Sequence, residues 1–273
     1  MAALIFLSHI HEETILAQTI QKAIEDEFGG FVEVFVSSDG KTIPPGTNFL
    51  KRIENGLINC VGAIYLISPI SVKRNWINFE LGAVWIRNSI CIISGGPEIP
   101  TIPFCHSGIT PGQLPMPLMN LNAIQANNSA RLEVAFKSIQ TSVGGKGQLK
   151  TNFNYLAQEI IKFELQYILG DNLITLFKLI AINNAGMNQG INQCKVFGKG
   201  KIWQIHLGFR DNNLFQILKG LETGALKGKM TATMEKPGIS FGTEGAINGG
   251  NTSILISTDL IIDFETQLNQ AIK

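Results

Sequence analysis

Short apolar runs alternate with helical patterns through the first 142 residues, and this alternation limits the fold more than any other feature. The runs at 4–7, 31–36 and 61–68 are rich in β-branched and aromatic residues, which is typical of buried strands. Between them, apolar residues recur every three or four positions over 15–28 and 48–59, which predicts helices. Strands that alternate with helices form βαβ units, so we expect a parallel sheet with helices on both faces.

The rest of this first part extends the same pattern. Residues 95–120 are rich in Pro and Gly and are predicted to be loop, and Ser129 is a possible helix cap. The remaining elements that we expect are a helix over 76–87, a fourth strand over 89–94, a fifth strand over 121–126 and a closing helix over 129–142.

A different pattern follows residues 143–152, a Gly- and Lys-containing stretch that we interpret as a linker between two domains, 1–142 and 153–273. The second domain begins with helical patterns and turns after Gly190 to period-two alternation, so we expect a smaller α+β domain with antiparallel strands. The predicted elements are helices over 154–169 and 172–183, and strands over 203–209, 226–234, 253–256 and 260–264.

Composition excludes several classes of protein. The net charge is +1, which argues against direct nucleic-acid binding through phosphate neutralisation. The apolar stretches are too short to cross a membrane, and the first residues lack the basic region of a signal peptide, so we expect a cytoplasmic protein without a membrane partner. No two of the four cysteines form a CxxC pair, and His106 and His206 have no partner at metal-ligand spacing. We therefore expect no bound metal.

Polar residues gather where the predicted strands end. Trp76 and Glu80 lie four positions apart and so share one face of the helix that follows the third strand. Ser8, His9 and Glu12 follow the first strand. Since ligands of parallel sheets bind outside the carboxyl ends of the strands, we expect these side chains at one ligand-binding edge, together with the loop 39–46 after the second strand.

These segments resemble the Toll/interleukin-1 receptor (TIR) domain, the bacterial branch most closely, over about residues 1–142. Any one of the motifs is weak, but all four occur in the right order. They are Ile5-Phe6-Leu7-Ser8-His9, the loop ending Ile43-Pro44-Pro45-Gly46, the strand Ala63-Ile64-Tyr65-Leu66-Ile67-Ser68, and Asn75-Trp76-Ile77-Asn78-Phe79-Glu80-Leu81-Gly82-Ala83, which fits the WxxxE motif of TIR enzymes.

The resemblance implies a flavodoxin-like fold and an enzyme of bacterial antiviral defence that cleaves the nicotinamide–ribose bond of NAD+. NAD+ would be the substrate, with no further cofactor. Nicotinamide leaves as a neutral molecule, so one carboxylate suffices, and Glu80 would stabilise the ribosyl cation. Trp76, Ser8, His9 and Glu12 would bind substrate. Asp39, Ile43 and Gly46 would act across a contact with a neighbouring copy, which implies self-association.

Other interpretations remain open. A non-catalytic TIR scaffold would work through TIR–TIR contacts alone, and a TIR cyclase would make a cyclic ADP-ribose messenger for a separate effector. Taken singly, Trp76 is more often a packing residue and Glu80 a solvated carboxylate. Residues 195–236 carry eight basic and three acidic side chains. This excess indicates either a sensor for an anionic activator such as a cyclic nucleotide, or a solvated sheet face; the domain could also hold an assembly together.

Overall fold

A computed structural model describes residues 2–37, 49–181, 184–224, 226–242 and 245–271. The chain forms two compact units, Met1–Leu165 and Gln166–Lys273. The elements that begin in the first unit are β1 (Ala3–Ser8), the 3-10 helix η1 (His11–Glu13), α1 (Thr14–Phe28), β2 (Val32–Val36), α2 (Phe49–Asn59), β3 (Cys60–Ile67), η2 (Ser71–Lys73), α3 (Asn75–Ile93), β4 (Thr101–Cys105), η3 (Pro111–Gln113), η4 (Leu118–Asn120), β5 (Ile124–Gln125), α4 (Ser129–Ser142) and α5 (Phe153–Leu179).

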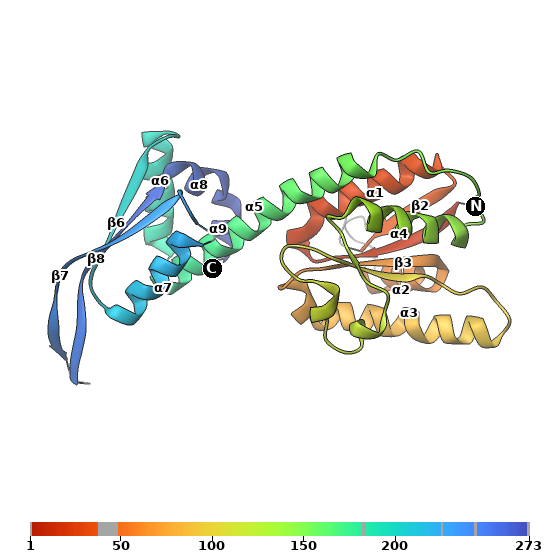
Figure 1. Cartoon of the computed structure of the whole chain (residues 1–273), viewed down its shortest axis with the longest axis horizontal. Coiled ribbons are helices and arrows are strands. Elements are labelled where there is room, and N and C mark those ends of the chain that lie inside the picture. Colours follow the sequence, from red (N-terminus) through yellow and green to blue (C-terminus); the bar gives the residue numbers. More distant parts are fainter. Residues whose placement is uncertain (1, 38–48, 182–183, 225, 243–244, 272–273) are drawn as a thin grey trace. The chain divides into compact units, whose positions relative to one another are not determined.

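The first unit is built on a five-stranded sheet of order β2-β1-β3-β4-β5 in which every pairing is parallel. This is the flavodoxin-like strand order, and the predicted fold class is confirmed. Helices α1 and α4 cover one face of the sheet, and α2 and α3 cover the other (Figure 1). Each face buries its own apolar cluster, and the first turns of α5 add Leu156, Ala157 and Ile160 to the cluster under α1 and α4.

The predicted fourth strand over 89–94 is wrong. Helix α3 continues to Ile93, and the glycines that follow terminate it: Gly95 has a φ of +77°, and Gly96 N–H donates to the Cys91 carbonyl at 2.8 Å. Ile90 is 60% exposed and Ile93 is 85% exposed, so this β-branched run lies on a helix surface and not in the sheet. The actual strand β4 lies inside the predicted loop 95–120, where the proline at its centre argued against a strand.

The second unit contains a three-stranded antiparallel sheet of order β6-β8-β7 and its helices. Its core includes Leu173, Leu176 and Phe177 of α5. The smaller α+β fold predicted here is confirmed. Its remaining elements are α6 (Asn184–Phe197), β6 (Ile202–Asp211), α7 (Asn212–Thr223), β7 (Met230–Gly242), β8 (Gly245–Ser257), α8 (Thr258–Asp263) and α9 (Glu265–Ala271).

Two predictions for the second unit are corrected. The helices expected over 154–169 and 172–183 are one helix, α5, because Gly170 is not a break. A Cβ at this position would lie 2.9 Å from the Phe264 ring, so the glycine makes room for packing. The strand expected over 260–264 is helix α8, which is capped by Ser257, whose side chain accepts a hydrogen bond from Asp259 N–H. Short apolar runs do not separate strand from helix by periodicity alone.

The boundary between the compact units lies inside α5, and the stretch interpreted as a linker is attached to the first unit. Glu27 at the end of α1 accepts hydrogen bonds from the backbone N–H groups of Lys150 and Thr151 at 2.7 to 3.0 Å. Leu149 packs against the apolar cluster under α1 and α4. The residues just before α5 are therefore fixed to the unit that they follow.

Candidate functional site

Glu80 is a fully buried carboxylate at the carboxyl end of the parallel sheet. One oxygen, Oε2, accepts a hydrogen bond from the Ser8 hydroxyl at the end of β1. The other, Oε1, accepts from the Trp76 indole N–H at 2.8 Å, one helical turn earlier on α3. The structure thus brings together three of the residues that we singled out, and both carboxylate oxygens point at donors. The sequence missed that Ser8 and Trp76 contact Glu80 directly.

The turn before α3 places Trp76 and Glu80 at this edge. Ser68 directly follows β3, and its backbone N–H donates to the Ser71 hydroxyl at 2.7 Å, while its own hydroxyl accepts from the Ser71 N–H at 3.1 Å. The Ser71 hydroxyl also donates to the Leu66 carbonyl at 3.2 Å. The hydrogen bonds between these two buried serines hold the tight turn that contains η2. Helix α3 therefore begins only a few residues after the end of β3, beside the carboxyl edge of the sheet.

Burial changes the acidity of Glu80. Loss of hydration disfavours the charged carboxylate and raises its pKa from 4.5 to about 7, although the hydrogen bonds from Ser8 and Trp76 act in the opposite direction. The carboxyl therefore changes charge near neutral pH. Groups with strongly shifted pKa values concentrate at functional sites. The pKa of Glu80 and its position at the edge of the sheet therefore indicate the same residue as the functional carboxylate.

The other predicted substrate-binding residues have different surroundings. His9 is 5% exposed and follows β1 directly. Glu12 lies on the surface, where its Oε1 is 3.3 Å from Nη2 of Arg74. Asp39, Ile43 and Gly46 lie outside the described residues. Phe79 is 59% exposed, and its ring centroid lies 5.1 Å from that of Trp76 with the two planes tilted by 31°.

A buried polar cluster that the sequence did not reveal lies after β4. The His106 Nε2 and Glu13 Oε1 atoms are 3.3 Å apart, and both side chains are fully buried. Glu164 of α5 accepts hydrogen bonds from Ser107 N–H at 2.9 Å and from the Asn127 amide at 2.8 Å. These contacts join segments that are far apart along the chain, so no spacing indicated them. The bonds to Glu164 attach the part of α5 that belongs to the first unit to the segments that follow β4 and β5.

An apolar groove of about 630 Å³ runs between α2 and α3 beside Trp76. Five large apolar side chains of the groove are 53 to 61% exposed to solvent, and such a contiguous apolar surface is uncommon on a protein. They are Leu50, Ile58, Phe79, Ile86 and Ile90.

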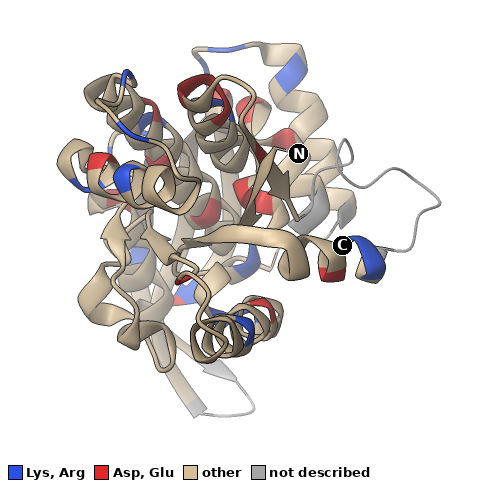
Figure 2. Ribbon diagram, turned by 90° about the vertical axis from the view of Figure 1, so that its right-hand side faces the viewer, with Lys and Arg blue, Asp and Glu red and all other residues tan. Residues whose placement is uncertain are grey.

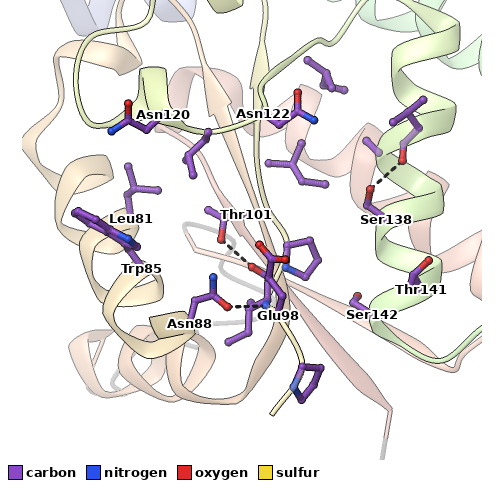
Figure 3. Close-up of a pocket in the computed structure, with 18 of the residues that line it drawn as sticks. Leu81, Trp85, Asn88, Glu98, Thr101, Asn120, Asn122, Ser138, Thr141 and Ser142 are labelled. Carbon is purple, nitrogen blue, oxygen red and sulfur yellow. Dashed lines mark hydrogen bonds between the residues drawn. The ribbon is translucent and has the colours of Figure 1, made fainter. Parts of the chain in front are cut away.

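A larger cavity of about 840 Å³ lies elsewhere in the first unit, between α3, β4 and α4. Its polar lining consists mainly of amide and hydroxyl side chains, with Glu98 beside Asn88 (Figure 3). Asn88 Oδ1 accepts from Ile99 N–H at 2.8 Å and so is engaged in holding the cavity wall. Glu80, Trp76 and Ser8 do not line this cavity. We place the candidate active site at Glu80, because chemistry depends on the placed carboxylate and not on cavity size.

Charged residues of both signs are interspersed over the ribbon (Figure 2). In the basic segment of the second unit, Lys195, Lys199 and Lys219 pair with Glu265, Asp263 and Glu222. In the part of the chain that the structure describes, no group of three or more His, Cys, Asp or Glu side chains is arranged to hold a metal. None of the helices in the described ranges is long and apolar enough to span a membrane.

No family model matches the sequence, and no curated protein matches it significantly. Among the solved structures that match the chain is a metazoan TIR-STING receptor from C. gigas in complex with 2′,3′-cGAMP. The two chains are 15% identical, and the match covers 98% of this chain and 77% of that chain with a TM-score of 0.35. A likeness of this size does not fix a function, which depends instead on this chain's own residues.

Proposed function

We propose that the first unit is a TIR-type domain that cleaves the nicotinamide–ribose bond of NAD+, with Glu80 as the catalytic carboxylate. The observation that carries the proposal is the arrangement at Glu80: a fully buried carboxylate with a pKa near 7, held by Ser8 and Trp76 at the ligand-binding edge of a parallel sheet. The four sequence motifs of the TIR resemblance support it, since two of them supply these three residues.

The geometry suits stabilisation of a ribosyl cation. Each carboxylate oxygen accepts two hydrogen bonds, and Ser8 and Trp76 occupy one on each. Two positions then remain for further donors, and a ribose hydroxyl can occupy one of them. The ionised carboxylate would then lie beside the cation that develops as nicotinamide leaves, in a site of low dielectric where that interaction is strong. Water as the incoming nucleophile gives ADP-ribose, and an atom of the adenine gives cyclic ADP-ribose.

Self-association belongs to this proposal. The predicted contributions of Asp39, Ile43 and Gly46 come from a neighbouring copy, so activity would rise with protein concentration. The exposed side chains of the α2–α3 groove lie next to Trp76 and provide an apolar surface for such contacts. In this proposal the second unit controls assembly or binds an anionic activator through the basic side chains of 195–236.

The test is incubation of NAD+ with the full-length protein over a range of concentrations, followed by NMR of the products. We expect free nicotinamide from the unchanged chain and none from Glu80→Gln. Glu133→Gln is the matched control, because this carboxylate pairs with Lys137 on the surface of α4 and its loss should leave turnover unchanged. ADP-ribose or a cyclic isomer as the second product identifies hydrolase or cyclase. Equal turnover by Glu80→Gln would refute the assignment.

The exposed apolar groove also favours a second candidate, a scaffold that acts through TIR–TIR contacts without catalysis. This candidate predicts concentration-dependent association that is abolished by Ile86→Glu, with no nicotinamide release at any concentration. The enzyme predicts that association and nicotinamide release are lost together in Ile86→Glu. Sedimentation velocity and the NAD+ assay on the same samples separate the two functions.

A further inference from the structure

Tyr65 is a buried residue of β3 whose hydroxyl has no hydrogen-bond partner among the described residues. Its exposure is 0%, and it is one of the largest fully buried side chains. A buried hydroxyl that has lost its water and gained no partner destabilises the folded state. Phenylalanine would fill the same volume without this cost, so the hydroxyl needs an explanation other than packing.

The sheet places Tyr65 under the Glu80 site. In the parallel ladder between β1 and β3, Tyr65 is the register partner of Ser8, and register partners on adjacent strands point to the same face. Tyr65 belongs to the apolar cluster of the face covered by α2 and α3, together with Phe6, two positions before Ser8. Ser8 donates to Glu80, so the tyrosine lies beside the residue that holds the carboxylate.

Electrostatics agree with this placement. Burial and the nearby negative charge of Glu80 raise the pKa of Tyr65 well above 10. The phenol is therefore protonated at every physiological pH and can act as a donor. Hydrogen bonds from a neutral donor to a carboxylate are stronger than those between neutral groups, so an ionised Glu80 would favour the tyrosine as a partner.

We propose that Tyr65 is a positioning residue for Glu80: its hydroxyl donates to the carboxylate when Glu80 ionises, and holds it in that state for the reacting ribose. In the present structure this hydrogen bond from Tyr65 to Glu80 is not formed, and Ser8 and Trp76 are the donors to the carboxylate. The catalytic part of this proposal rests on the proposed function, whereas the contact between Tyr65 and ionised Glu80 does not.

Among the described residues, the neighbouring elements carry these titratable or charged groups: His9 after β1, Glu12 and Glu13 of η1, and Arg74 before α3. Strand β3 adds Cys60, whose charge would also raise the pKa of Tyr65. The pKa of Cys60 is itself raised by burial, so the thiol is neutral when Glu80 titrates.

The test compares the full-length chain with Tyr65→Phe by following the indole N–H signal of Trp76 in ¹⁵N-labelled protein as a function of pH. This signal reports Glu80 because the indole donates to that carboxylate, and its loss in Trp76→Phe identifies it. We expect the midpoint to move upward by about one pH unit in Tyr65→Phe, since a bond made only to the charged form lowers the pKa. Tyr155→Phe, at an exposed tyrosine of α5, should leave the midpoint unchanged.

Two further measurements keep the result decisive. At pH 5, where Glu80 is neutral, Tyr65→Phe should melt at the same temperature as the unchanged chain or higher; a lower melting temperature would mean that the hydroxyl has a structural partner, and the proposal would be wrong. An unmoved Trp76 midpoint would overturn it equally.

With NAD+ at pH 7, kcat should fall about tenfold with KM unchanged. If the unchanged chain releases no nicotinamide, the proposed function fails, and the Trp76 titration still decides the role of Tyr65.

Discussion

Replacing Glu80 by glutamine should remove a pH dependence of stability that the buried carboxyl imposes on the first unit. Folding raises the pKa of Glu80 from 4.5 to about 7, so between these values the folded chain binds more protons than the unfolded chain. Stability due to this group is then greatest below pH 4.5 and is lost as the pH rises to 7. A pKa difference of one between the folded and unfolded chains corresponds to about 1.4 kcal/mol, and between pH 5 and pH 8 the loss amounts to about 2 to 3 kcal/mol.

The assay is urea unfolding at pH 5 and pH 8, followed by hydrogen exchange of peptides from β1 and β3, which report the first unit alone. From pH 5 to pH 8, the free energy of unfolding of the unchanged chain should fall by about 2 to 3 kcal/mol more than that of Glu80→Gln, because glutamine does not ionise. Glu133→Gln should follow the unchanged chain. Equal pH dependence of Glu80→Gln and the unchanged chain would show that Glu80 titrates in the folded state as it does in water.

Three further outcomes follow from the structure. Trp76→Phe removes the indole donor that lowers the pKa of Glu80, so nicotinamide release at pH 6.5 should fall about tenfold and recover partly at pH 8. Glu164→Ala leaves a buried backbone N–H and a half-buried Asn127 amide without their acceptor and should lower the free energy of unfolding of the first unit in urea by about 2 to 3 kcal/mol, whereas Glu164→Gln should lose less. Gly190→Ala places a Cβ 2.1 Å from the tryptophan ring of β6 and should destabilise the second unit by about 1 to 3 kcal/mol, whereas Gly220→Ala, with open space in α7, should stabilise it by up to about 1 kcal/mol; hydrogen exchange of β6 peptides measures both.

Periodicity predicted those parts of the fold in which local pattern and burial coincide. The strands β1 to β3 and helices α1, α2 and α4 follow from apolar spacing, because their buried faces contact one sheet. The prediction failed where tertiary contacts override local preference. Ile90 to Ile93 have the composition of a strand but continue a helix, and Gly170 sits mid-helix because Phe264 occupies the space of a side chain.

The site was predictable to a smaller extent. The i, i+4 spacing placed Trp76 and Glu80 on one face, and the strand ends placed Ser8 near them. The burial of Glu80, its pKa and its hydrogen bond from Ser8 depend on packing between β1 and α3, which no local pattern specifies. Tyr65 resembled any large core residue of a buried strand, and only the unpartnered hydroxyl distinguishes it.

The continuous helix α5 has a consequence for how such a chain can be rearranged in evolution or by design. Its first turns complete the core of one unit, and its last turns complete the core of the other. Each half of α5 must come from the same parent protein as the core that it fills. A chimera of two related proteins meets this condition when the junction lies at the boundary between Leu165 and Gln166. The two units are therefore exchangeable as modules only when α5 is divided with them, so chimeras joined at residues 143–152 should express as aggregates, whereas those joined inside α5 near the boundary should fold.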